Sequence, residues 1–180
     1  MTLRARVAAA FLVLAAAGRT LAADAPASSS ASPEGLALAR LGRLKALAGT
    51  WSGKASHRAG DAADAKVEWS VTGGGTAVVE RLFPGTPHEM MTVYVVDGRD
   101  LVLTHYCAAG NQPTMKARPE GGTDLIVFDF VSGGNMRPTD AHMHAAVITF
   151  LPDGGLRTDW SSFKNGGVSD TVTFELRRER

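Results

Sequence analysis

From Thr50 to Arg177 the sequence repeats one pattern, in which short segments of alternating apolar and polar residues are separated by turn-forming residues. Alternation with a period of two is typical of strands with one buried face, because successive side chains point to opposite sides. The pattern predicts ten strands, at Thr50–His57, Lys66–Thr72, Thr76–Phe83, Met90–Val96, Leu101–Cys107, Thr114–Arg118, Leu125–Val131, His142–Phe150, Leu156–Phe163 and Thr171–Arg177.

The segments between these strands are short and rich in glycine, proline, asparagine and aspartate, as at Asp97-Gly98 and Asn165-Gly166-Gly167. Such connections favour antiparallel neighbours, since a parallel crossover needs roughly a dozen residues or more. Closing a long antiparallel meander on itself removes its exposed edges. We therefore predict an all-β fold, an up-and-down antiparallel β-barrel of about ten strands.

The N-terminal residues have the layout of a secretory signal peptide. Arg4 and Arg6 precede an apolar run over residues 7–17, and small residues follow around Ala23. The run is shorter than the roughly 20 residues that a membrane-spanning helix needs. We predict a signal peptide at 1–23 and a flexible linker at 24–33, where the chain is small and polar.

The remaining residues, 34–180, are predicted to form one β-barrel domain. Because no cysteine follows the apolar run to carry a lipid anchor, we expect a periplasmic or secreted protein without stable membrane insertion. A short helix precedes the barrel, with Ser32 as its cap, Pro33 at its first position and an end near Gly49. Its basic residues leave membrane-surface binding open, but packing of its leucines on the domain is favoured. These leucines are Leu36, Leu38, Leu41, Leu44 and Leu47.

Charge argues against nucleic acid as a partner. The whole chain has 19 Lys and Arg against 18 Asp and Glu, and residues 1–23 contain three arginines and no acid. The mature form therefore has 16 basic and 18 acidic residues, a net charge of −2. Without a basic stripe, the electrostatic attraction to phosphates is missing. Cys107 is the single cysteine, so an intramolecular disulfide is excluded.

The segment Gly49-Thr50-Trp51, just after the helix, resembles the motif with which lipocalins and related calycin barrels begin. The resemblance implies that the tryptophan closes one end of the barrel against the helix. The lack of a disulfide and the ten strands are closer to fatty-acid-binding and nitrobindin-like barrels. Two further blocks, at residues 105–113 and 142–144, are similar to blocks in uncharacterised bacterial exported proteins with a lipocalin-like domain, a family that implies no known activity.

Histidines two residues apart on a strand share a face, which makes His142 and His144, with His105, candidate metal ligands. Imidazole nitrogens suit zinc or copper, and ligation of haem iron by one histidine is a variant. Whether His142 and His144 point inward depends on register. Pairing of Phe150 with Leu156 places them inside, and a shift of one residue places them outside.

A thiol enzyme is another possibility, with Cys107 as nucleophile and a histidine as base. Same-strand geometry between His105 and Cys107 is poor for proton transfer, whereas a histidine across the strands is better placed. Asn111 supplies a candidate oxyanion donor, although asparagine is also a common turn residue. No Ser-His-Asp order or phosphate-binding loop supports a more specific enzyme.

The favoured hypothesis is an exported barrel that holds a small, largely apolar ligand in its interior. A metal- or haem-binding barrel, a thiol enzyme and a barrel that binds an envelope partner through its rim remain alternatives. The sequence identifies no cofactor, with zinc and haem as the candidates, and leaves the oligomeric state open. The candidate ligand-binding residues are Tyr94, His105, Cys107, Asn111, His142, His144 and Trp160.

Overall fold

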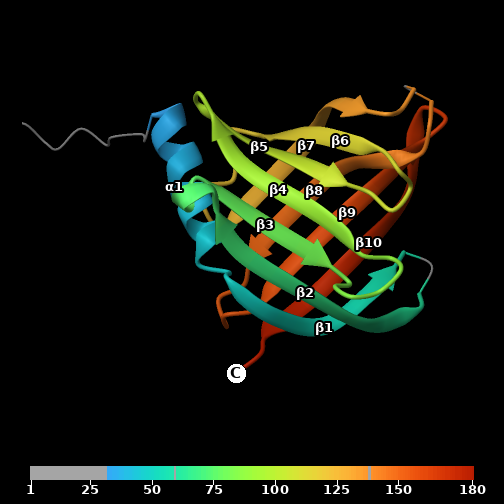
Figure 1. The fold of residues 1–180 in the computed structure, drawn as a ribbon, viewed down its shortest axis with the longest axis horizontal. Coiled ribbons are helices and arrows are strands. Elements are labelled where there is room, and N and C mark those ends of the chain that lie inside the picture. Colours follow the sequence, from blue (N-terminus) through green and yellow to red (C-terminus); the bar gives the residue numbers. More distant parts are fainter. Residues whose placement is uncertain (1–31, 59, 138) are drawn as a thin grey trace, which may run out of the picture. The chain divides into compact units, whose positions relative to one another are not determined.

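The structure, a computed structural model, describes residues 32–58, 60–137 and 139–180. The predicted signal peptide and residues 24–31 of the predicted linker lie outside the described residues. The described residues form one α-helix, one 3-10 turn and ten strands (Figure 1). The elements are α1 (Pro33–Lys45), β1 (Gly49–His57), β2 (Ala62–Thr72), η1 (Gly73–Gly75), β3 (Ala77–Leu82), β4 (Met90–Asp97), β5 (Asp100–Tyr106), β6 (Gln112–Ala117), β7 (Leu125–Gly134), β8 (His142–Phe150), β9 (Leu156–Lys164) and β10 (Gly167–Arg178).

Each strand pairs antiparallel with the next along the chain, and β1 pairs with β10 to close the barrel. The predicted fold class and the predicted number of strands are therefore confirmed. The largest boundary differences are at β2 and β10, which begin at Ala62 and Gly167. The ladder continues there through small and polar residues, where alternation of hydrophobicity no longer marks a strand.

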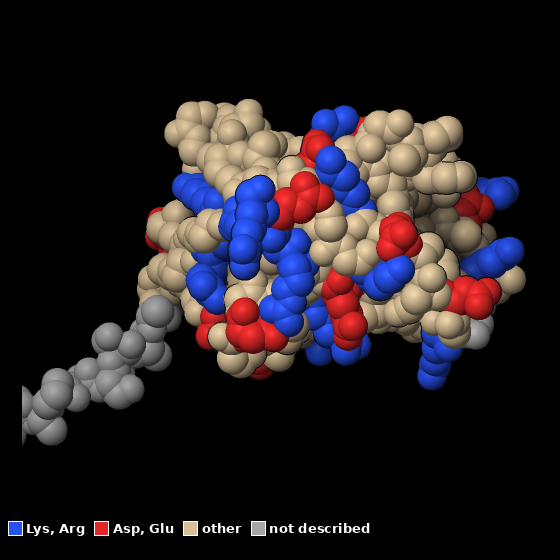
Figure 2. Space-filling view, turned by 90° about the horizontal axis from the view of Figure 1, so that it is seen from below, with Lys and Arg blue, Asp and Glu red and all other residues tan. Residues whose placement is uncertain are grey.

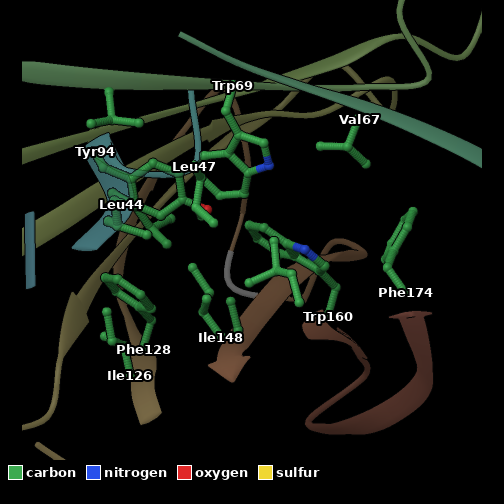
Figure 3. Packing of buried hydrophobic residues seen from close by; sticks show 14 of the residues in the cluster. Leu44, Leu47, Val67, Trp69, Tyr94, Ile126, Phe128, Ile148, Trp160 and Phe174 are labelled. Carbon is green, nitrogen blue, oxygen red and sulfur yellow. The ribbon is translucent and has the colours of Figure 1, made fainter. Parts of the chain in front are cut away.

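The inward-facing side chains fill the half of the barrel next to α1. Figure 3 shows Trp69 and Trp160 projecting from opposite walls, with Tyr94 and Phe128 beside them. The Trp69 and Tyr94 rings stack with their centroids 5.6 Å apart. This half of the interior is therefore a packed core. It also contains the buried residues Leu44, Leu47, Val67, Leu101, Leu103, Met115, Ile126 and Ile148.

Helix α1 covers one end of the barrel. Its buried apolar face consists of Ala37, Leu41 and Leu44. Leu38, which was predicted to lie in the apolar stripe, is half exposed. The Ser32 hydroxyl accepts a hydrogen bond from the Gly35 amide at 3.1 Å, as expected for the cap. The leucine face thus packs on the domain, as the favoured interpretation of the helix predicts.

Trp51 fixes the chain where the helix passes into β1. Its indole N–H donates to the Leu47 carbonyl at 2.8 Å, and the Arg178 guanidinium lies 4.8 Å from the centre of the ring. Arg178 also donates to the carbonyls of Ala46 and Ala48. The tryptophan therefore joins the helix end to the first and last strands.

Arg40 connects the helix to the loop between β6 and β7. Its side chain is buried, and it donates to the carbonyls of Arg118, Glu120 and Gly122 at 2.5, 2.5 and 2.6 Å. One guanidinium thereby satisfies three backbone acceptors of a loop that has no strand partner at these positions.

The outer surface carries both signs of charge. In the face seen in Figure 2, Lys and Arg side chains lie next to Asp and Glu side chains over much of the barrel wall. Ion pairs such as Lys54–Asp64 and Arg157–Asp159 are exposed and contribute little to stability individually. Within the described part of the chain, no helix is long and apolar enough to cross a membrane.

Gly53 allows β1 and β10 to approach closely. A Cβ at this position would lie 1.8 Å from the carbonyl oxygen of Glu175. We expect Gly53→Ala to lower the free energy of unfolding by about 1–3 kcal/mol, because the strands must separate. Urea unfolding measures the loss. Gly42→Ala is the matched control, since its Cβ would meet no described atom within 4 Å outside the neighbouring backbone of its own helix. Equal effects of the two substitutions would contradict the prediction.

Candidate functional site

A cavity of about 360 Å³ lies in the barrel interior at the end opposite α1. We call it the far-end cavity. Strand ends shape it, because β1 and β3 finish here while β2, β4 and β8 begin here. Its wall is mainly apolar. The lining residues are Ala55, His57, Asp61, Ala63, Leu82, Phe83, Met90, His105, Met143, Trp160, Val172 and Phe174.

A larger hollow of about 620 Å³ lies elsewhere, on the outer side of β1 and β2. Its lining includes the exposed side chains of Lys54, Asp64 and Lys66. It is open to solvent, where hydrogen bonds and ion pairs are weak. The smaller far-end cavity is the better candidate site, since enclosure and buried polar groups are what give a pocket affinity and specificity.

His105 and Trp160 lie at the inner end of the far-end cavity, next to the packed core. His105 comes from β5 and Trp160 from β9, and their ring centroids are 4.9 Å apart. Their relative exposures are 1% and 2%. Two nitrogen-containing rings from non-adjacent strands therefore meet beneath an apolar chamber.

Each of these rings has a nitrogen that lacks a protein partner. His105 Nδ1 lies 2.9 Å from Thr92 Oγ1, but His105 Nε2 and Trp160 Nε1 have no hydrogen-bond partner among the described residues. Buried polar atoms are normally hydrogen-bonded, and leaving one unpaired costs about 1–3 kcal/mol. Burial lowers the pKa of His105 to about 4, so its ring is neutral at physiological pH.

A row of inward-facing residues leads from His105 into the core. Register pairs Glu80 of β3 with Thr92 of β4, and Thr92 with His105 of β5. The Tyr94 hydroxyl donates to Glu80 Oε2 at 2.7 Å. Burial raises the pKa of Glu80 to about 7, against the opposing effect of its hydrogen bond with Tyr94. We call Glu80, Thr92 and His105 the polar row.

Glu80 and Thr92 were not among the residues selected from the sequence. The signal was nevertheless present, because Glu80 lies between Val78 and Leu82 on the buried face of β3. A carboxylate on an apolar strand face predicts a buried charge, which is expensive unless it is partnered or protonated.

The register of β8 answers the question about His142 and His144. Phe150 pairs with Leu156, and Ile148 and Ala146 point inward as expected for that pairing. A register shift between Met143 and Ala145 then changes the alternation, and Met143 lines the far-end cavity. His142 and His144 are not among the residues that line this cavity, and the β-bulge beside them ends the simple alternation on which their predicted direction depended.

His142 and His144 instead contact each other and two phenylalanines. His142 Nε2 lies 3.0 Å from His144 Nδ1, and His142 Nδ1 lies 2.7 Å from the Asp140 carbonyl oxygen. The His144 ring stacks between Phe130 and Phe163, with centroid distances of 5.0 and 4.2 Å. Both nitrogens of His142 and Nδ1 of His144 are therefore engaged in hydrogen-bond contacts.

The three histidines do not form one metal site. His105 lies in the far-end cavity with Thr92 and Trp160, away from the His142–His144 pair. Across residues 32–58, 60–137 and 139–180, no group of three or more His, Cys, Asp or Glu side chains could hold a metal ion. The three predicted metal ligands therefore lie at two separate places, with His105 at one and the His142–His144 pair at the other.

Cys107 and Asn111 belong to the turn after β5. The strand ends at Tyr106, and the Cys107 amide donates to the Asn111 carbonyl at 3.1 Å. Strand alternation therefore does not place Cys107 on the same face as His105, and the predicted strand boundary is one residue too long. Asn111 Nδ2 donates to the Ala141 carbonyl at 2.8 Å, which holds this turn against the start of β8.

Of the seven ligand-binding candidates, His105 and Trp160 line the far-end cavity. Tyr94 lies one layer deeper on β4 and contacts Glu80. Cys107, Asn111, His142 and His144 are not among the residues that line this cavity. The sequence therefore found two residues that line the cavity, and it missed the polar row next to them.

Comparison with known proteins supports the barrel and goes no further. The sequence matches no family model, and no curated protein matches it. Among solved structures, the chain is similar to the crystal structure of Rv2717c from M. tuberculosis, with a TM-score of 0.50 and 17% sequence identity. The match covers 78% of this chain and 98% of that chain. At this identity the likeness concerns the fold, which is a barrel that both chains share.

Proposed function

We propose that this chain is an exported, calycin-like barrel protein that binds a small, largely apolar molecule in the far-end cavity. The observation that carries the proposal is a cavity with a mainly apolar wall, whose lining includes the buried rings of His105 and Trp160. Ligand pockets typically combine many apolar contacts with a few well-placed polar groups. The barrel is packed at the α1 end and contains a chamber at its other end. This arrangement suits a protein that receives its ligand from one side.

Two sequence features support the rest of the proposal. The layout of residues 1–23 supports export to the periplasm or outside the cell. The Gly49-Thr50-Trp51 segment, with Trp51 hydrogen-bonded to the helix end, supports the calycin-like description. The cavity volume of about 360 Å³ is near the lower limit of the roughly 300–1,000 Å³ usual for ligand pockets. The ligand is accordingly small.

Naphthalene, an uncharged apolar probe, tests the site by isothermal titration calorimetry. We expect saturable binding with a negative heat-capacity change, because apolar surface is buried. Val172→Phe should weaken binding at least tenfold by filling the cavity. Val168→Phe is the matched control, since it makes the same change on the same strand at an exposed position. Binding that Val172→Phe leaves intact would place the ligand outside this cavity.

Haem ligation is the second candidate, and one observation favours it. His105 Nε2 is buried without a described partner, and a neutral imidazole nitrogen of this kind is a common iron ligand. Titration with haemin separates the candidates. A Soret band that shifts on binding and is lost in His105→Leu would support haem, whereas naphthalene binding without such a band supports the apolar ligand.

A further inference from the structure

We propose that Phe83 closes an opening in the barrel wall and thereby limits the size of the molecule that the far-end cavity admits. This inference rests on the proposed function, because it assumes that the cavity holds a ligand. It adds the residue that decides which apolar molecules fit. Among the described residues, Phe83 alone lines both the far-end cavity and the hollow of about 620 Å³ outside β1 and β2. We call this second space the outer hollow.

The opening lies beside β2, where β3 stops. Pairing between β2 and β3 ends at Leu82, and the last hydrogen bond runs from the Phe83 N–H to the Lys66 carbonyl at 3.0 Å. Residues 62–65 of β2 pair with β1 on one side, whereas no described strand pairs with their other side. The chain instead makes a loop over residues 83–89 before β4 begins. Side chains, and not a hydrogen-bonded ladder, therefore close the wall between β2 and this loop.

The two spaces are neighbours along the β1–β2 ladder. Gly53 and Ala65 form one pair of this ladder, and both line the outer hollow. Ala55 and Ala63 form a pair two residues further along, and both line the far-end cavity. At these four positions the side chains are no larger than a methyl group, so they cannot separate the two spaces. Phe83 supplies the bulk that they lack.

The backbone at Phe83 directs its ring toward the interior. Its φ is 53°, in the left-handed region that bulky residues rarely adopt. The other described non-glycine residues with positive φ are Asn135 and Asn165, of a type that tolerates it. Because Leu82 is buried, an extended Phe83 would point away from the interior. The ring instead packs against Phe174, with its centroid 5.6 Å away.

Hydrogen bonds within the loop hold this conformation. The Phe83 carbonyl accepts from the Thr86 amide at 3.2 Å and from the Thr86 hydroxyl at 2.8 Å. The Glu89 carboxylate accepts from the Gly85 amide at 2.6 Å and from the Arg81 guanidinium at 2.8 Å. An unfavourable backbone conformation persists only where its surroundings fix it, and such residues gather at ligand sites. The Phe83 ring is therefore a fixed part of the wall.

Straight-chain alcohols from hexanol to tetradecanol test the size limit by displacing naphthalene, whose fluorescence reports its release. Each added methylene should strengthen binding about fourfold, which corresponds to about 0.8 kcal/mol, until the chain fills the cavity. We expect the affinity of the wild-type protein to stop rising at a chain length that Phe83→Gly exceeds by about three methylenes or more. Glycine adopts a φ of 53° without strain, so the loop should keep its shape.

Met143→Ala is the matched control. Met143 lines the far-end cavity and not the outer hollow, so its truncation enlarges the cavity without opening the wall. This variant should lengthen the limit by about one methylene at most. Phe83→Leu keeps an apolar side chain of smaller size and should give an intermediate limit. It decides the question if Phe83→Gly does not fold, as judged by circular dichroism.

The outcomes separate this inference from the proposed function. The same limit in the wild type and in the folded Phe83 variants would overturn the inference while the cavity remains a binding site. An equal increase in Phe83→Gly and Met143→Ala would also overturn it, because added volume alone would then explain the change. If neither naphthalene nor any alcohol bound the wild type, the proposed function would be overturned and the inference with it.

Discussion

In the Glu80→Gln variant, the free energy of unfolding is expected to fall by about 3 kcal/mol as the pH is lowered from about 6.5 to about 4, at 1.4 kcal/mol per pKa unit. The wild-type protein should change much less over this range. The prediction comes from two buried groups of the polar row whose pKa values move in opposite directions. Burial raises the pKa of Glu80 from 4.5 to about 7 and lowers that of His105 from 6.5 to about 4.

The two groups have opposite effects on stability. A histidine whose pKa is lower in the folded state binds fewer protons there, so stability is lost as the pH falls through the range from 6.5 to 4. A carboxyl whose pKa is raised by folding binds more protons in the folded state, so stability is lost as the pH rises from 4.5 to 7. In the wild type the two dependences largely cancel between these values. Replacing one of the two groups makes the pH dependence that the other causes measurable.

Urea unfolding at half-unit pH steps measures both dependences. The reciprocal variant, His105→Leu, should lose stability as the pH rises from about 4.5 to about 7, by a similar 3 kcal/mol. Ion-paired surface carboxylates such as Asp153 also titrate at low pH, but they are common to all three proteins. The difference between variants is therefore the readout. Parallel pH profiles of the wild type and Glu80→Gln would show that Glu80 has an ordinary pKa.

Arg40→Ala is expected to lower the free energy of unfolding by about 4 kcal/mol, since hydrogen bonds to charged groups contribute about 1.5–3 kcal/mol each. The substitution removes the three hydrogen bonds to the loop between β6 and β7. It also leaves a gap under α1, where the Arg40 side chain is buried. Arg40→Lys should recover only part of the loss, because an ammonium lacks the planar fork that reaches three carbonyls.

Arg43→Ala is the matched control, as the same change on the same helix. Arg43 is 42% exposed and pairs with Asp124, so its loss should cost about 1 kcal/mol or less. Thermal or urea unfolding of the three variants gives the comparison. If Arg40→Ala and Arg43→Ala were equally mild, the carbonyls at 118, 120 and 122 would have to be satisfied by solvent, and the loop would not depend on the helix.

Local sequence patterns predicted the barrel because strand formation and turns depend on neighbouring residues. Apolar residues at every second position mark β5 and β9 clearly, and glycine-rich turns separate them from their neighbours. At β2 and β10 the prediction started four residues late, because Ala62 and Gly167 extend a ladder that only their partners reveal. Hydrogen bonding across strands is not encoded by hydrophobic alternation.

The candidate site was predicted only in part, because strand alternation gives the direction of a side chain only where the strand is regular. His105 and Trp160 lie on strands whose burial alternates regularly, and both are on the buried face. His142 and His144 lie beside a register shift, and a bulge of one residue cannot be read from β8 alone. Cys107 lies just beyond the end of its strand, where a period of two no longer holds.

The sequence by itself determined that this protein is a closed meander of ten strands with a short helix, because period-two burial and tight turns are local properties. Only the tertiary structure decided which polar residues meet. Glu80, Thr92 and His105 form a row because antiparallel register aligns three different strands. Barrel closure then brings Trp160 of β9 beside His105 of β5. Contacts between strands so far apart in the chain depend on the sum of all registers around the barrel.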